Sequence, residues 1–191
     1  VNEFAGYLSV GLAAWLSAEI ASAYGYAFFP FLPGIVFAFA GLLISLFFVK
    51  DTKDFVLAES ITSKVPLFKS AWKETTWKHK NISSVSFNGM VNNLNDGVIW
   101  GVLPVLLLQK GFSISQVGIV AGIYPVVWGI SQLFTGKMGD HYCKKQIITA
   151  GMLLQAVAIV ILAFAFAMPL LITSSVLLGL GTAMVYPNFL S

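Results

Sequence analysis

Polar side chains between residues 88 and 96 are those in this sequence best suited to chemistry, because they interrupt a long apolar stretch. At about 100° per residue of an α-helix, Asn88, Asn92, Asn95 and Asp96 fall on one arc of the helix surface. A charged group inside such a helix is costly and faces a cavity or a partner. The arc therefore predicts either a polar cavity or a cluster of hydrogen bonds between helices. Four polar groups on one arc, with no lysine in any predicted apolar span to pair with Asp96, favour the cavity.

In a cavity these side chains would bind different parts of a solute. Asparagine suits hydroxyl and amide groups, while an aspartate binds a cation or carries a proton. Aromatic side chains nearby in the sequence and in the next apolar stretch suit an apolar or aromatic body. We therefore expect a substrate or proton site formed by Asp96, Asn88, Asn92, Asn95, Trp100 and Tyr124.

The sequence does not favour an enzyme. Chemistry inside a membrane needs a nucleophile with a base, or a metal cluster. His79, His141 and Cys143 all lie between the apolar stretches, and Asp96 is the only acid in the middle of one. We expect no catalytic residue, no metal site and no cofactor.

The composition indicates a polytopic membrane protein. Of the 191 residues, 58% are hydrophobic and 10% are charged, whereas soluble domains carry about 25% charged residues. All 11 cationic side chains are lysines, and the formal net charge is +3. Because the lysines gather between apolar blocks, they indicate membrane topology. We therefore expect a lipid bilayer as a partner, and no nucleic acid.

Six stretches are long and apolar enough to cross a membrane. They are predicted at 3–23, 27–49, 85–108, 116–136, 147–167 and 170–190. The connections 50–84 and 137–146 hold every lysine except Lys110. Since positively charged loops stay in the cytoplasm, we expect both connections to be cytoplasmic.

Small residues and prolines predict how these helices pack. Small side chains let helices approach closely in lipid, and they recur in two spans, at Ser9, Ala13, Ser17 and Ala21 and at Gly118, Gly122, Gly129 and Gly136. Prolines inside three spans predict kinks, since each removes one helical hydrogen bond. These are Pro104, Pro125 and Pro187.

The segment "GKMGDHYCKK", residues 136–145, resembles the loop signature of the major facilitator superfamily, Gly-x-x-x-Asp-Arg-x-Gly-Arg-Lys. Four residues match in kind and spacing, namely Gly136, Asp140, Lys144 and Lys145. His141 stands where arginine is usual, and Cys143 where glycine is usual. A cysteine tolerates a left-handed turn less well than a glycine does.

The resemblance covers the whole chain and implies its fold and organisation. It implies an all-α membrane protein, a polytopic helical bundle whose six helices correspond to helices five to ten of twelve. Residues 1–49 would form the last two transmembrane helices of the N-terminal half, 50–84 a cytoplasmic linker, and 85–191 the first four transmembrane helices of the C-terminal half. "NNLNDGVIWG" looks like the seventh helix of some bacterial members, and "GLGTAMVYPN" looks like a tenth helix. We therefore expect the sequence to be part of a longer chain, whose remainder is its main partner.

The resemblance also implies a function. Members carry small solutes by alternating access, with the binding site near the middle of the membrane. This implies an integral protein of the bacterial inner membrane that is coupled to an ion, with protons as the candidate. The signature would stabilise one conformation through Gly136, Asp140, His141, Lys144 and Lys145. A scaffold that does not transport, or a channel subunit, is the alternative function.

Overall fold

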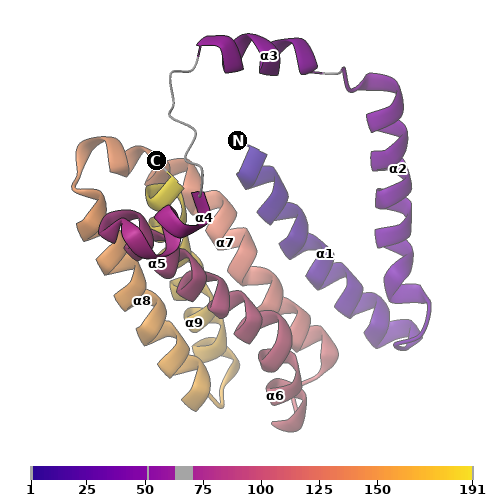
Figure 1. Cartoon of the computed structure of the whole chain (residues 1–191). Helices are drawn as coiled ribbons and strands as arrows, with labels where there is room; N and C mark the ends of the chain where they lie inside the picture. Colours follow the sequence, from indigo (N-terminus) through magenta and orange to yellow (C-terminus); the bar gives the residue numbers. More distant parts are fainter. Residues whose placement is uncertain (1, 51, 63–70, 191) are drawn as a thin grey trace. The chain divides into compact units, whose positions relative to one another are not determined.

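The computed structural model describes residues 2–50, 52–62 and 71–190, and these form helices joined by short connections (Figure 1). The first elements are α1 (Asn2–Tyr24), the 3-10 helix η1 (Phe29–Phe31), α2 (Leu32–Phe48) and α3 (Lys53–Thr62). Next come α4 (Ala71–Lys73), the π-helical segment η2 (Glu74–Lys78) and α5 (Lys80–Gly97). The last are the π-helical segment η3 (Val98–Val102), α6 (Leu103–Gln109), α7 (Ile114–His141), α8 (Lys144–Phe164) and α9 (Met168–Leu190).

The all-α, polytopic architecture is confirmed. Among the described residues, 6 helices are long and apolar enough to cross a membrane. They are Glu3–Tyr24, Phe29–Phe48, Lys80–Gln109, Ile114–His141, Lys144–Phe164 and Met168–Phe189. Each contains one of the six predicted spans or nearly all of it, because a run of about 20 apolar residues is the dominant signal in such a chain.

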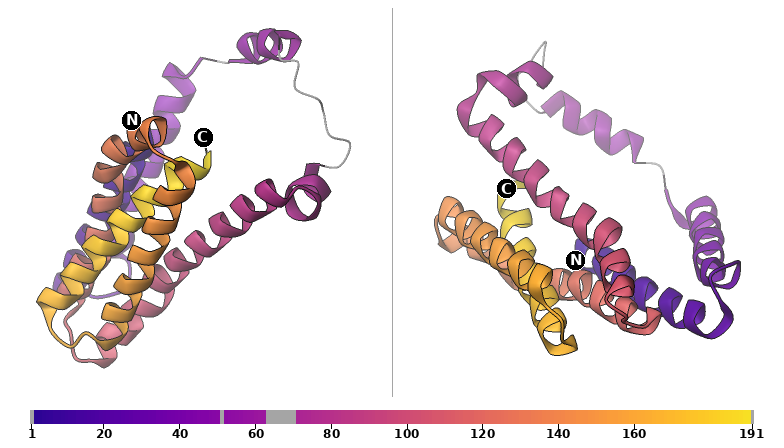
Figure 2. Two further views of the ribbon diagram at one scale, coloured as in Figure 1. Left: turned by 90° about the vertical axis from the view of Figure 1, so that its left-hand side faces the viewer. Right: turned by 90° about the horizontal axis from the view of Figure 1, so that it is seen from below.

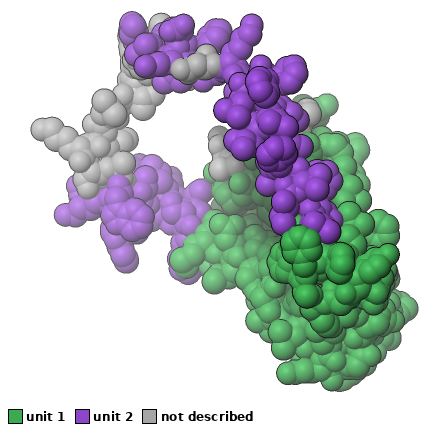
Figure 3. All heavy atoms as spheres, turned by 90° about the vertical axis from the view of Figure 1, so that its right-hand side faces the viewer, with its two compact units in different colours: residues 1–31, 88–191 green, residues 32–87 purple. Residues whose placement is uncertain are grey.

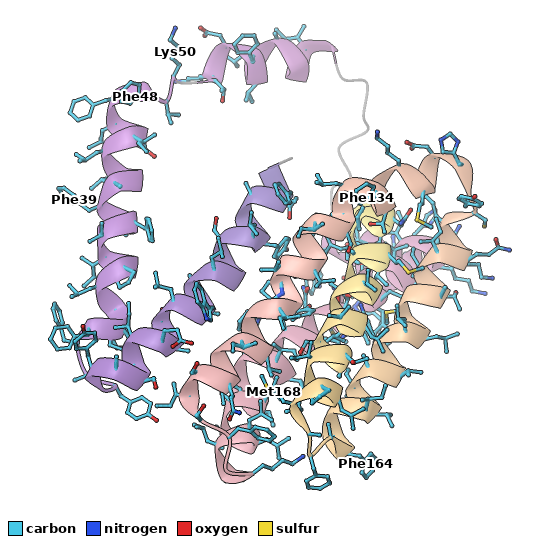
Figure 4. All side chains as sticks on the ribbon, turned by 180° about the vertical axis from the view of Figure 1, so that it is seen from behind. Phe39, Phe48, Lys50, Phe134, Phe164 and Met168 are labelled. Atoms are coloured by element: carbon cyan, nitrogen blue, oxygen red, sulfur yellow. The ribbon has the colours of Figure 1, made fainter. Side chains whose placement is uncertain are left out.

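The chain divides into two compact units (Figure 3), residues 1–31 with 88–191, and residues 32–87. The second unit holds α2, α3, α4, η2 and the first part of α5. None of the side chains of α2 is buried in this unit, and Phe39 and Phe48 project from it (Figure 4). A helix that is apolar all round suits contact with lipid or with other membrane helices.

The first unit is a bundle in which α9 lies beside both α7 and α8 (Figures 1 and 2). Its core is apolar and includes Leu103, Leu107, Val120, Leu171 and Leu178, each at most 1% exposed. Phe164, the last residue of α8, projects beside the short turn to α9 (Figure 4).

Glycines bring α1 and α7 into close contact, as predicted for Gly118, Gly122 and Gly129. A Cβ atom at Gly122 would lie 2.8 Å from the carbonyl oxygen of Gly11. One at Gly129 would lie 3.2 Å from the carbonyl oxygen of Phe4.

Other residues of the two predicted stripes lie outside this contact. α1 faces Gly118 with Ala14 and Ala18, whereas Ser9 and Ala13 are exposed. No described atom outside the neighbouring turns of α7 lies within 4 Å of where a Cβ at Gly136 would be. A regular spacing of small residues shows that two helices can approach, but several faces of α1 carry such residues.

Two boundaries of α7 differ from the prediction. The helix begins at Ile114 because Ser113 and Gln116 form a capping box, with the Ser113 amide donating to the Gln116 side chain at 2.9 Å. It ends at His141 rather than Gly136, so only Tyr142 and Cys143 separate it from α8. Leaving the apolar layer does not by itself end a helix, and residues 137–141 contain no proline, although they include Gly139 and Asp140.

The prolines are accommodated in different ways. Before Pro104 the chain widens into η3, where the Leu103 amide donates to the carbonyl of Val98, five residues earlier. A π-helical turn of this kind makes room for the proline ring and is frequent at functional sites. Pro125 and Pro187 lie inside α7 and α9, and both helices continue on either side of them.

Candidate functional site

Asp96 lies in the wall of a pocket within the first unit. The pocket has a volume of about 430 Å³ and is lined by Tyr7, Val10, Asn93, Asp96, Trp100, Trp128 and Tyr186. The walls come from α1, α5, η3, α7 and α9, so chain segments distant in sequence meet here. The pocket therefore combines one carboxylate and one exposed amide with four aromatic rings.

The aromatic rings are packed against one another. The rings of Tyr7 and Trp128 are stacked with centroids 3.5 Å apart, and Tyr186 meets Trp128 edge to face at 5.5 Å. Trp100 belongs to η3, and its ring centroid lies 6.3 Å from that of Tyr124. Such rings present flat apolar surfaces and, through their faces, attract cations.

A second group of polar side chains lies buried behind the pocket. Asn95 donates through Nδ2 to Gln155 Oε1 at 2.6 Å, and Gln155 Nε2 donates to Asn92 Oδ1 at 2.7 Å. Gln155 Nε2 also donates to Thr182 Oγ1 at 3.1 Å. These bonds connect α5, α8 and α9, and we call the four residues Asn92, Asn95, Gln155 and Thr182 the amide network.

Tyr124 joins the pocket to the amide network. Its hydroxyl donates to Asp96 Oδ1 at 2.7 Å and lies 3.3 Å from Thr182 Oγ1. The Tyr124 side chain is fully buried, in the apolar centre of the bundle. A change at Asp96 can therefore reach buried residues of α9 through a single side chain.

The structure separates the six predicted site residues. Asp96 and Trp100 line the pocket, whereas Asn92 and Asn95 are 0% and 8% exposed and lie in the amide network. Tyr124 links the two groups, and Asn88 is half-buried on α5 outside both. One part of the polar arc thus borders a pocket, and the other part forms hydrogen bonds between helices.

Several residues of the site were not predicted. Gln155 was missed although it is the single amide in the predicted apolar stretch 147–167, which is a usable signal. Thr182, Tyr7 and Tyr186 carry no signal of this kind, because threonine and tyrosine are common in membrane helices. Asn93 lies outside the predicted arc and nevertheless lines the pocket.

The signature residues lie around the junction of α7 and α8. Gly136, Asp140 and His141 are exposed on the last two turns of α7, and Lys144 and Lys145 begin α8. Cys143 has φ −63° and ψ 113°, so the left-handed turn that would favour glycine does not occur there.

Within the segment 136–145, the glycine that makes a close contact is Gly139, which stands at a variable position of the signature. A Cβ atom there would collide with Oδ1 of Asn188 on α9. Within the described residues, no group of three His, Cys, Asp or Glu side chains could hold a metal ion.

Comparison with known proteins identifies relatives of part of the chain. The sequence model described as Major Facilitator Superfamily matches residues 85–191, which is more than half of the chain. Relatives include the Quinolone resistance protein NorA of Staphylococcus aureus strains N315, MW2 and COL, each 30% identical over 110 residues. The matched region is 58% of this chain and 28% of each relative's length. No solved structure matches the chain.

Proposed function

The chain belongs to the major facilitator superfamily, and we propose that it forms part of a carrier that moves a small solute by alternating access, coupled to protons. It is an integral membrane protein with an all-α, major-facilitator-like fold, and proteins of this family are transporters rather than enzymes. Because the chain spans only 28% of its relatives' length, the activity belongs to a longer protein of which it supplies one part.

The observation that carries this proposal is the position of Asp96. It is the only ionisable carboxyl group among the described residues that line the pocket, and a tyrosine hydroxyl donates to it. A carboxyl group that borders a cavity can exchange a proton with water and also meet a solute, which is what coupled transport requires. Asp96 would therefore carry the proton or bind a cationic group of the solute.

The pocket also favours a class of solute. Four aromatic side chains, Tyr7, Trp100, Trp128 and Tyr186, suit a flat, largely apolar body, while Asp96 and Asn93 suit a cation or hydrogen-bond donors. We infer an aromatic compound with a protonated amine or a similar donor. The relative's name connects that protein with quinolones, so a quinolone bearing an amine is a reasonable first probe.

The organisation proposed from the sequence fits this function. Residues 1–49 would close the N-terminal half, 50–84 would be a cytoplasmic linker, and 85–191 would begin the C-terminal half. We place the chain in a bacterial inner membrane with 50–84 and 137–146 in the cytoplasm. Lys110, on the opposite side, donates to the carbonyl oxygen of Ala165 at 2.9 Å.

The signature would act on conformation rather than on the solute. Asp140 and His141 are exposed at the end of α7, where they can meet a neighbouring part of the full-length chain. Lys144 and Lys145 begin α8, where they can meet lipid phosphates. Gly136 would allow another helix to approach, since no described residue from elsewhere in the chain fills the space beside it.

Coupled transport in proteoliposomes tests the proposal, using the full-length protein that contains this sequence. A thermal-shift panel of aromatic amines, neutral aromatics and sugars, with a fluorescent quinolone included, first selects a solute that binds. We expect Asp96→Asn to abolish accumulation driven by a pH gradient while solute exchange without a gradient continues.

The matched control is Asp54→Asn, which removes an exposed carboxylate of α3 and should leave both activities unchanged. Full gradient-driven accumulation by Asp96→Asn would show that this residue does not couple protons.

A further inference from the structure

The Tyr124 hydroxyl stands between two acceptors but has one hydrogen to donate. It lies 2.7 Å from Asp96 Oδ1 on α5 and 3.3 Å from Thr182 Oγ1 on α9. A phenol donates one hydrogen bond and can accept others. Only one of these two helices can therefore receive the Tyr124 hydrogen at a time.

While its own hydrogen is donated to α9, Thr182 takes part as an acceptor from Tyr124. Its own hydroxyl hydrogen is donated to the carbonyl oxygen of Leu178 at 2.9 Å. Its oxygen accepts from Gln155 Nε2 at 3.1 Å. A hydroxyl oxygen has two lone pairs, so one position remains, and Tyr124 is the neighbouring group that can fill it.

We propose that Tyr124 is a hydrogen-bond switch that reports the protonation of Asp96 to α9. When Asp96 is ionised, Tyr124 donates to it and ties α7 to α5. When Asp96 takes up a proton from water in the pocket, its O–H donates to the Tyr124 oxygen, and the Tyr124 hydrogen turns to Thr182. The second arrangement ties α7 to α9 and fills every hydrogen-bonding position of Thr182.

The surroundings of Asp96 favour such a response. Facing it across the pocket are Tyr7 from α1 and Tyr186 from α9, and α7 contributes Tyr124. α8 contributes the neutral amide Gln155 to the network behind the pocket. No lysine or histidine is among the described residues that line the pocket. Without a cation as a fixed partner, the direction of the Tyr124 hydrogen bond is the local change that accompanies the charge.

The switch rests on the proposed exchange of a proton at Asp96, but its test needs no solute. The full-length protein is titrated in lipid while the infrared carbonyl band of the protonated carboxyl is followed. The band of Asp96 is identified by its absence in Asp96→Asn. The midpoint of this band against pH is the measured quantity.

Thr182→Val removes the acceptor that is used only when Asp96 is protonated. We expect its midpoint to move toward acid by about half to one pH unit, the equivalent of one neutral hydrogen bond. Thr182→Ser keeps the hydroxyl group. Its midpoint should therefore stay close to that of the unmodified protein. The matched control is Thr173→Val, because Thr173 also lies on α9 and bonds a carbonyl four residues earlier, at 2.8 Å, away from the network.

Tyr124→Phe supplies the decisive comparison. In that background Thr182→Val should produce no further movement of the midpoint, because the connecting hydroxyl is gone. Two results would overturn the switch. One is an equal shift of the midpoint by Thr182→Val in the Tyr124 and Tyr124→Phe backgrounds; the other is a shift no larger than that caused by Thr173→Val. If Thr182→Val does not fold, Thr182→Cys takes its place, since a thiol is a weak acceptor, with the same expected direction.

The outcome is separate from that of the transport assay. A shift in Thr182→Val together with normal coupling by Asp96→Asn would support the switch and refute proton coupling by Asp96. Loss of coupling in Asp96→Asn without any shift in Thr182→Val would leave the carrier proposal standing and refute the switch.

Discussion

Replacing Gln155 by methionine should destabilise the protein, because three hydrogen bonds between helices are lost. The side chain makes three hydrogen bonds, to Asn95, Asn92 and Thr182 at 2.6, 2.7 and 3.1 Å, and is 2% exposed. Methionine keeps the unbranched shape but has no comparable donor or acceptor. Side-chain hydrogen bonds between membrane helices contribute about 0.6 kcal/mol on average and about 1.7 at most. Three of them predict a loss of roughly 2 to 5 kcal/mol in the free energy of unfolding.

Unfolding of the purified full-length protein by a denaturing detergent measures this loss. Gln132→Met is the matched control, since Gln132 lies in α7 and its side-chain nitrogen is buried with no hydrogen-bond partner among the described residues. Removing that nitrogen should leave stability unchanged or raise it, because an unsatisfied buried donor costs free energy. If Gln155→Met proved no more destabilising than Gln132→Met, the amide network would not hold α5, α8 and α9 together.

Two further predictions concern the packing of α7 against α1 and the topology. Gly122→Ala should lower thermal stability while Gly136→Ala does not, because only the first added methyl group meets backbone, at the carbonyl oxygen of Gly11 on α1; equal melting temperatures would contradict this. In a variant without Cys143, an impermeant thiol reagent applied to intact cells should label Gln109→Cys and not Thr52→Cys, both at exposed positions. Labelling of Thr52→Cys alone would reverse the proposed orientation.

Apolar length was sufficient to predict the six membrane-spanning helices found among the described residues, but not where each one ends. The hydrocarbon layer sets a minimum length, and nothing in it obliges a helix to stop at the surface. The end of α7 at His141 depends on the chain that follows, and its start depends on the capping box at Ser113. The π-helical segment before Pro104 could not be predicted either. A proline in a membrane helix is compatible with a kink, with a bulge, or with a continuous helix whose free carbonyl groups bond to neighbouring groups.

The sequence shows which polar residues lie within the apolar spans, but it does not show which side chains they bond to. Asp96 was identified because a charge in an apolar span needs an explanation. The sequence shows that Asn92 and Asn95 share a face, but which helix they meet is decided by packing. Gln155 supplies that partner from 60 residues away, and no spacing rule connects α5 with α8.

The order of side chains around α5 explains why one polar arc serves two purposes. At about 100° per residue, Asn92 lies about 60° from Asn95, Asp96 about 40° beyond Asn92, and Asn93 about 60° beyond Asp96. The first two are buried in the amide network, and Asn93 is exposed in the pocket. Asp96 therefore stands at the border between them, bonded to Tyr124 on the network side and open to the pocket on the other. At this border a carboxyl group can exchange a proton with water and still change a buried hydrogen bond. A position further into the network would lose access to the proton, and one further into the pocket would lose contact with Tyr124.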